Sequence, residues 1–591
     1  MSDKRDKVED EPNAVEIELL TADEDDNYEG LTLKCILVYT SILVGCAAQV
    51  LAIVATGAFS RNVAAVVGGE DKYVWIPQGL VICVTFTAAP IAQSSDFWGR
   101  RYPILICTAL CLIGSLLISR AVSMTMAIAG SLLVGVGSGS SSLLYAVASE
   151  IMPRRYRPMA QAGVNVANSL GGIFTLLIGF ALVKKSDQGF RVVWYIGAGL
   201  FAINFIAILF LFRPPKRALQ VTLTLQQKLR ALDWIGYVLF SIGMILFSVG
   251  LTWANNPYPW KNAHVLSTFI VGIVFIALTV VWEAKKKDGF CHHGLFETSR
   301  NFALALLFIF VEGFTFYAIN NFLPFEFSLL FDSDQFMVGV LTSIIFIGGS
   351  AASLIGGLYS VKTKTVRPPL MAGMSLFVIY FTCMTTIKAD QSVASIWGLT
   401  VLAGFGLGFG LSIAITAGQI STPPGLIATT SGLILTARSL GGSVALPAYT
   451  AILNSLLSKN LGPKIANKVL PLGLSASDLP AFIGALANND QQALASIPGV
   501  NPEVISAGLD GLRTAYRIAF HGIWTTAAAV SAVGLIFTFF VEEPRKSFNM
   551  HVDAPVEHEI APKLKVDREP AKTNNETATG ADTMDPISKE A

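Results

Sequence analysis

The sequence predicts an all-α membrane protein in which two six-helix bundles, related by a parallel pseudo-two-fold axis, are joined through two inserted central helices. Three observations support this fold class: an apolar composition, about fourteen long apolar segments, and an internal repeat. Of the 591 residues, 53% are hydrophobic and only 14% are charged, whereas a soluble domain carries about 25% charged residues. So few charges exclude an ordinary soluble enzyme. The net charge of +1 gives the chain no overall attraction for nucleic acid.

The apolar segments have the length of membrane-spanning helices, which need about 20 mostly apolar residues. Lipid leaves backbone groups without hydrogen-bond partners, so each segment must be a helix or part of a closed barrel. Because the segments lack strict alternation, a barrel is excluded. The predicted spans are 35–58, 73–93, 102–119, 124–148, 160–183, 192–212, 233–253, 264–283, 302–323, 336–359, 369–388, 394–416, 425–454 and 517–541.

The distribution of Lys and Arg in the short loops predicts the orientation. Loops on the side of the N-terminus carry 17 of these residues and the opposite loops carry 8, so we expect both termini in the cytosol. The expected parts are an acidic disordered N-terminus at 1–32, a first bundle at 33–213, a linker with the two inserted helices at 214–300, a second bundle at 301–541 and a disordered tail at 542–591. Within the second bundle, we expect 455–516 to be a long external loop with short amphipathic helices at the membrane surface.

The internal repeat consists of two glycine signatures that recur in the same order. Ser169-Leu-Gly-Gly172 recurs as Ser439-Leu-Gly-Gly442, and Gly135-Val-Gly-Ser-Gly139 recurs as Gly406-Leu-Gly-Phe-Gly410. Both copies start on the same side of the membrane, which predicts two parallel halves, as in major facilitator transporters. The alternative is that glycine-rich helix faces recur simply because small residues are common at helix contacts.

The segment from Ala92 to Arg101 resembles the loop signature of the major facilitator superfamily, Gly-x-x-x-Asp-(Arg/Lys)-x-Gly-Arg-(Arg/Lys). The matching residues are Asp96, Gly99, Arg100 and Arg101. We expect Asp96 to lie near a helix N-terminus, where negative charge is favoured. Arg100 or Arg101 would pair with it in a latch that breaks when the halves rock, and Glu150 and Arg154 would join the same cytosolic gate. The alternative is an ordinary positively charged turn.

The fifth predicted span resembles the exporter signature Gly-x-x-x-Gly-Pro-x-x-Gly-Gly, with matches at Gly163, Gly171 and Gly172 and with Asn168 in place of the proline. The resemblance implies export rather than import, and the alternative is that these small residues only allow close packing. Drug/proton antiporters usually carry an Arg in the fourth span and often an Asp in the first. This chain has Ser131 and Gln49 there.

The whole layout resembles the fourteen-span group of the superfamily. Within it, Leu232-Asp-Trp-Ile-Gly-Tyr-Val-Leu-Phe240 and the segment from Gly250 to Trp260 look most like the fungal trichothecene efflux pump family. The resemblance implies a fungal source and the export of a toxic or secondary metabolite. Siderophore–iron transporters of fungi have a similar layout.

Two charged residues lie near the middle of predicted spans, where a charge costs about 2.5–3.5 kcal/mol. Glu312 is in the ninth span and Arg438 in the thirteenth, at the repeat position of Asn168. In this fold, the corresponding helices line the central cavity. We therefore expect Glu312 to carry the coupling proton, with Arg438 as its partner or as a substrate anchor. The alternative is a static ion pair that holds helices together.

Further polar side chains within the spans are candidates for substrate contact. They are Gln49, Gln78, Tyr317 and Asn320. The alternative for the aromatic residue is an anchor at the membrane interface. Cys291-His-His293 offers too few ligands for a closed metal site, so we expect no metal and no other cofactor.

The chain lacks the phosphate loop Gly-x-x-x-x-Gly-Lys-(Ser/Thr), so transport driven directly by ATP is not expected. The resemblance implies a monomeric secondary transporter, not an enzyme, that exports a hydrophobic or amphipathic toxin, drug or secondary metabolite by alternating access, with proton antiport. The expected location is the plasma membrane, with the vacuolar or a vesicle membrane as alternatives. Two other functions stay open: siderophore–iron uptake by proton symport, and a non-transporting membrane sensor, which would usually need a longer signalling tail.

Overall fold

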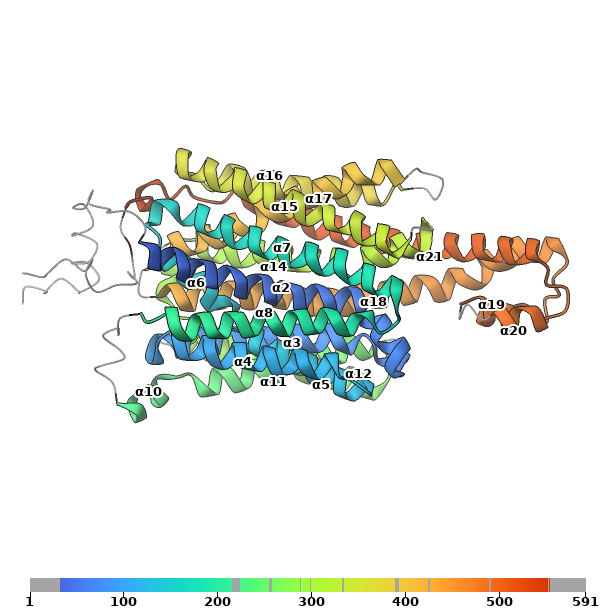
Figure 1. The fold of residues 1–591 in the computed structure, drawn as a ribbon, viewed down its shortest axis with the longest axis horizontal. Helices are drawn as coiled ribbons and strands as arrows, with labels where there is room; N and C mark the ends of the chain where they lie inside the picture. The colour runs from blue at the N-terminus through green and yellow to red at the C-terminus, as the bar shows by residue number, and fades with distance from the viewer. Residues whose placement is uncertain are drawn as a thin grey trace, which may run out of the picture.

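The computed structural model describes residues 32–214, 224–254, 258–286, 289–297, 299–331, 334–387, 393–423, 426–487, 491–550 and 552. Over this part of the chain the regular structure is helical, and thirteen helices are long and apolar enough to cross a membrane. The predicted fold class is confirmed. The predicted disorder at 1–32 and 542–591 lies mostly outside the described residues. The long helices run side by side, as Figure 1 shows.

The first half of the molecule comprises the first six predicted spans. Its helices are α2 (Leu33–Val67), α3 (Trp75–Trp98), α4 (Arg101–Ser119), α5 (Met124–Ser138), α6 (Ser141–Glu150), α7 (Arg157–Lys185) and α8 (Gly189–Leu211). The fourth span is divided between α5 and α6 at Gly139 and Ser140. At this break the Ser140 hydroxyl donates to the carbonyl of Gly137 and accepts from the side chain of Gln49.

The inserted helices are central in the sequence but peripheral in space. They are α11 (Trp234–Trp253) and α12 (Ala263–Lys285), flanked by the short helices α10 (Leu225–Ala231) and α13 (Gly294–Glu297). The two long helices pack on each other, and α11 also contacts α3 and α18. Asp233 begins α11, where its Oδ1 accepts from the backbone N–H of Gly236 and from the side chains of Trp282 and Lys286. Burial alone raises the pKa of Asp233, but its hydrogen bonds outweigh burial and hold the pKa below the usual range.

The second half comprises the last six predicted spans. Its helices are α14 (Asn301–Leu330), α15 (Gln335–Thr363), α16 (Arg367–Met384), α17 (Val393–Ile420), α18 (Ile427–Val469) and α21 (Pro502–Thr538). The helix α16 corresponds to the eleventh predicted span and is not among the thirteen. It has 18 residues and begins with Arg-Pro-Pro, which lowers the mean hydropathy over its length. It packs between α17 and α21 and completes this half.

The two halves meet along two helix pairs, α7 with α15 and α3 with α18. These contacts are equivalent under the sequence repeat, because α7 corresponds to α18 and α3 corresponds to α15. A pseudo-two-fold axis between the halves requires that each contact across the interface occur twice, and these two helix pairs meet that requirement. Small residues allow the close approach: Gly357 of α15 lies against Pro158 and Ala162 of α7.

The prediction that 455–516 is a long external loop is wrong. Most of it continues the helices: α18 runs to Val469 and α21 begins at Pro502, so the two helices project beyond the others (Figure 1). The short helices α19 (Leu479–Ala487) and α20 (Gln491–Ser496) lie between them. This helical hairpin has an apolar core of its own that includes Ile465, Phe482 and Leu512, so these side chains pack on one another within the hairpin. We call this end of the molecule the hairpin side, and the end where α2 begins and α21 ends the terminal side.

Candidate functional site

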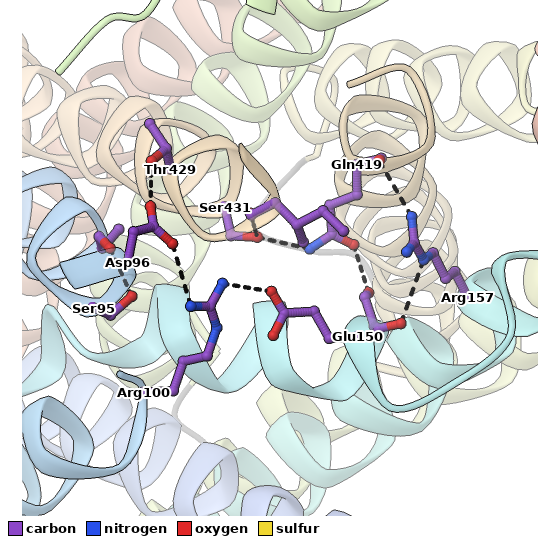
Figure 2. Close-up of polar contacts among 11 residues, drawn as sticks. Ser95, Asp96, Arg100, Glu150, Arg157, Gln419, Thr429 and Ser431 are labelled. Atoms are coloured by element: carbon purple, nitrogen blue, oxygen red, sulfur yellow. Dashed lines mark hydrogen bonds and ion pairs between the residues drawn. The ribbon is translucent and has the colours of Figure 1, made fainter. Parts of the chain in front are cut away.

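Three of the predicted latch residues meet on the terminal side of the first half. Asp96 lies in the last turn of α3, Arg100 just before α4, and Glu150 at the end of α6. The guanidinium of Arg100 lies 3.2 Å from Asp96 Oδ1 and 2.7 Å from Glu150 Oε1 (Figure 2). All three are almost fully buried, at 8%, 3% and 1% exposure for Asp96, Arg100 and Glu150. Buried charges are tolerated when they are paired, so removal of any one of the three side chains would leave a buried charge without its partner.

Asp96 also forms a hydrogen bond with the second half of the molecule. Its Oδ2 accepts a hydrogen bond of 3.0 Å from the hydroxyl of Thr429, in the first turn of α18. Asp96 thus lies near a helix N-terminus, as expected, although its own helix α3 continues past it to Trp98 and is capped by Gly99. Gly99 has φ 85°, which a glycine adopts without strain. The helix start that Asp96 faces belongs to α18.

The other two predicted latch residues, Arg101 and Arg154, lie at the start of α4 and in the short turn before α7. Arg101 donates to the carbonyl of Leu209 at the end of α8, which fastens α4 within the first half. Arg154 lies in the short turn before α7. Its neighbour Arg157 reaches the second half, since it donates to the carbonyl of Gln419 as well as to that of Ser149 in the first half.

Gln419, in the last turn of α17, is the centre of the contacts between the halves on the terminal side (Figure 2). Its Oε1 accepts from the hydroxyl of Ser149 at 2.6 Å and from the side chain of Gln161 at 3.2 Å. Its Nε2 donates to Ser431 of α18. Together with the bond between Asp96 and Thr429, these contacts close the terminal side, and we call them the terminal-side network. Its members are Asp96, Arg100, Ser149, Glu150, Arg157, Gln161, Gln419, Thr429 and Ser431.

Glu312 and Arg438 form a two-pronged ion pair that links α14 and α18. Arg438 Nε lies 2.6 Å from Glu312 Oε2, and its Nη2 lies 2.9 Å from Oε1. The exposure of Glu312 is 0% and that of Arg438 is 8%. The guanidinium also lies 4.8 Å from the ring centroid of Phe316. A planar arginine fork on a carboxylate fixes geometry as well as charge.

The ion pair borders the first half through Tyr145 of α6. This tyrosine is close enough to Arg438 and Glu312 to interact with both electrostatically. Its hydroxyl accepts a hydrogen bond of 2.6 Å from Asn168 of α7. Tyr145 of the first half is thus held by Asn168 and interacts with the ion pair of the second half, so a movement between the halves changes the surroundings of the pair.

The four expected substrate-contact residues are buried in the interior. Gln49 bonds to Ser140 within the first half, while Gln78 donates to the carbonyl of Ser443 in α18 and so joins the halves. The Oε1 of Gln78 and the Nδ2 of Asn320 are buried and have no hydrogen-bond partner among the described residues. Tyr317 packs against Gly442. Two unpartnered polar atoms are free to bind a polar group once a path opens.

The three exporter-motif glycines make close contacts between helices. Gly163 lies against the hydroxyl of Tyr39, Gly171 against the backbone of Ala47, and Gly172 against the ring of Phe346 in α15. Nearby, Asn165 of α7 donates to the hydroxyl of Ser353 in α15, across the halves. What these contacts show is packing of α7 on α2 and α15.

A cavity of about 200 Å³ lies between the halves towards the hairpin side. Its walls come from both halves and include Arg61 of α2, Phe180 of α7 and Phe325 of α14. Neither Glu312 nor Arg438 lines it. In this conformation the ion pair is enclosed by side chains, so the expectation that it faces the central cavity does not describe this state.

Glu326 is a second buried acid in α14, with an exposure of 1%. Its carboxylate accepts a hydrogen bond of 2.9 Å from the indole of Trp524 in α21, and no Lys or Arg of the described chain pairs with it. An unpaired carboxylate is costly in such a place. The predicted ninth span ended at 323, which placed Glu326 in a loop. Its flanking residues Phe325 and Phe327 were the signal that the helix continues.

The family model of the major facilitator superfamily matches residues 75–446, which is more than half of the chain and includes both halves of the repeat. The chain belongs to the major facilitator superfamily. The predicted family and the arrangement of two parallel halves are thereby confirmed.

Curated relatives within the superfamily are fungal transporters. The MFS-type transporter ucsD of Acremonium sp is 25% identical over 67% of each chain. The efflux pump aflT of Aspergillus parasiticus is 25% identical over 73% of this chain and 81% of its own. The efflux pump FUS6 of Gibberella fujikuroi is 23% identical over 81% and 84%. These relatives agree with the resemblance to fungal efflux pumps.

Solved structures of major facilitator transporters share the fold. A bacterial homologue of the human lysosomal transporter Spinster, in an inward-facing and unoccupied conformation, has a TM-score of 0.51 and 16% identity over 87% of this chain and 99% of its own. The proton:xylose symporter XylE has a TM-score of 0.51 and 10% identity over 87% and 97%. The relatives and the structural neighbours are transporters, not enzymes.

Proposed function

We propose that this chain is a secondary active exporter of a hydrophobic toxin, drug or secondary metabolite, which works by alternating access and proton antiport. The observation that carries the proposal is the contrast between the two ends of the interface. Side chains of both halves close the terminal side, whereas a cavity lies between the halves towards the hairpin side. Relatives named as efflux pumps support export.

The orientation follows from the excess of Lys and Arg in the loops of the terminal side, 17 against 8. We place that side in the cytosol, the protein in the plasma membrane, and the working unit as a monomer. The conformation is then closed to the cytosol. The hydrogen bonds of the terminal-side network that cross the halves contribute about 0.5–1.5 kcal/mol each between neutral groups, and about 1.5–3 kcal/mol each where Asp96 or Arg157 takes part. Opening this side therefore requires a substantial share of the free energy of substrate binding.

Glu312 is our candidate for the coupling proton. As long as Arg438 is bound to it, the buried charge of the carboxylate is compensated. A rocking motion that moves Tyr145 and Asn168 away from the pair changes its surroundings, and a carboxylate that loses Arg438 takes up a proton, because an unpaired charge is costly there. Proton uptake on one side and release on the other would drive export.

Purified protein in proteoliposomes provides the test, with a panel of fungal toxins and iron chelates as substrates. Glu312→Gln is expected to abolish transport driven by a pH gradient but to retain exchange of labelled for unlabelled substrate, because exchange needs no net proton movement. Glu297→Gln, the same change at an exposed position of α13, serves as the control. Full pH-driven export by Glu312→Gln rejects the role of this residue, and uptake of iron chelates in place of toxin export rejects the direction.

A further inference from the structure

We propose that the hairpin-side cavity is a binding site for an aromatic organic anion, with Arg61 as the group that pairs with the anion. This inference rests on the proposed function for its place on the transport path, and it narrows the substrate class to amphipathic acids. Three features carry it: the charge of the lining, the partners of Arg61, and the aromatic walls.

The lining of the cavity carries a single charge. Of the described residues that line it, Arg61 alone is charged, and the polar remainder is neutral: Ser60, Asn62, Tyr73, Asn321, Ser328, Gln335 and Thr450. The net charge of the lining is therefore positive. A cavity bounded by protein and lipid concentrates the field of such a charge, so it attracts an anion and repels a cation.

Arg61 has only neutral partners among the described residues. One terminal nitrogen lies 3.3 Å from the hydroxyl of Tyr73 and donates to it, and the guanidinium carbon lies 3.6 Å from the ring centroid of Phe325. The buried arginines Arg100 and Arg438 are paired with carboxylates instead. A guanidinium offers five N–H donors in a planar fork that matches a carboxylate, and the contacts of Arg61 leave donors available.

The remaining walls suit an aromatic ring system. The aromatic side chains around the cavity come from α7, α14 and the turn before α3, and they are Phe180, Phe322, Phe325 and Tyr73. Aromatic faces stack favourably on planar ligands. The volume of about 200 Å³ is below the roughly 300–1,000 Å³ of pockets for whole drug-sized ligands. In this conformation the cavity therefore has room for the acidic ring of a larger molecule.

Binding of an anion here also affects the contact between the halves. Arg61 belongs to α2 of the first half and Phe325 to α14 of the second, so the stacked pair joins the halves on the hairpin side. A ligand carboxylate competes with the ring for the guanidinium. The bound anion would loosen this contact and favour opening of the hairpin side, which is the direction that release requires.

The test uses the full chain in lipid nanodiscs and two probes of the same shape, the anion 2-naphthoate and the neutral 2-naphthamide. Equilibrium binding is measured for the wild type, Arg61→Gln, Arg61→Lys and the control Arg120→Gln, which removes an exposed arginine on the same side outside the cavity. We expect the wild type to prefer naphthoate and Arg61→Gln to lose naphthoate affinity at least tenfold, with naphthamide changed less than twofold. Arg61→Lys should lie between the two, and the control should match the wild type.

The proposal is overturned if the wild type binds naphthamide as tightly as naphthoate or binds neither. It is also overturned if Arg61→Gln lowers the affinity for both probes equally, because Arg61 would then only stabilise the contact with Phe325 between the halves. The preference of the wild type needs no variant, so an unstable Arg61→Gln still leaves a decisive measurement. The binding measurement requires no gradient. If the protein prefers naphthoate but transports nothing, only the proposed function is contradicted. If it exports neutral toxins and does not prefer naphthoate, only the present inference is contradicted.

Discussion

Gln419→Leu is expected to open the terminal side. The substitution removes two hydrogen bonds that cross the halves, from Ser149 and from Gln161 to Oε1. Each contributes about 0.5–1.5 kcal/mol, so the closed state should lose about 1–3 kcal/mol relative to the open state. That loss corresponds to a shift of about 5–150-fold in the ratio of closed to open molecules. The lower part of this range is expected, since Gln161 keeps its bonds to Ser149 and to the carbonyl of Tyr145.

Spin-label distances measure this shift directly. Labels at Tyr156 and Lys362 occupy exposed positions on the terminal side, one in each half. Double electron–electron resonance then gives the populations of short and long distances between the labels. Gln226→Leu, the same change at an exposed position of α10, is the control and should leave the populations unchanged. If Gln419→Leu leaves the distance distribution as in the wild type, the network does not hold the halves together.

Two further predictions concern buried charges. Arg438→Met should destabilise the protein by about 3–5 kcal/mol, because it leaves Glu312 buried and unpaired; adding Glu312→Leu should recover most of the loss, and a thermal melt in detergent that shows no recovery contradicts a compensated pair. Glu326→Gln should melt close to the wild type, since an amide oxygen still accepts from Trp524, whereas Glu326→Leu should lose about 1–3 kcal/mol by leaving the indole N–H without a partner. A large loss for Glu326→Gln in the same melt would show that the carboxyl is needed in its ionised form.

Much of the fold was predictable because its signals are local. Long apolar runs predict the spans, and two short signatures in the same order predict the halves. The pair of Glu312 and Arg438 was predictable because two isolated charges in apolar helices have few other partners. The loop signature likewise pointed to Asp96 and Arg100, although it did not tell which helix start Asp96 faces.

The contacts between the halves were not predictable, for a physical reason. Gln419, Gln161 and Tyr145 are uncharged, and nothing in their neighbouring sequence distinguishes a polar residue that bonds across an interface from one that faces its own bundle. Their roles depend on how the two halves dock. The projecting hairpin was missed because the apolar spacing around Ile465 and Leu512 fits a helix on a membrane surface as well as one packed on another helix.

A reversible cross-link between Asn165→Cys and Ser353→Cys tests most directly whether the halves separate on the terminal side during transport. These positions face each other across α7 and α15, and the double variant in proteoliposomes should transport normally while reduced. Oxidation should stop transport, and addition of a reductant should restore it. Undiminished transport by fully cross-linked protein would contradict alternating access between these two halves.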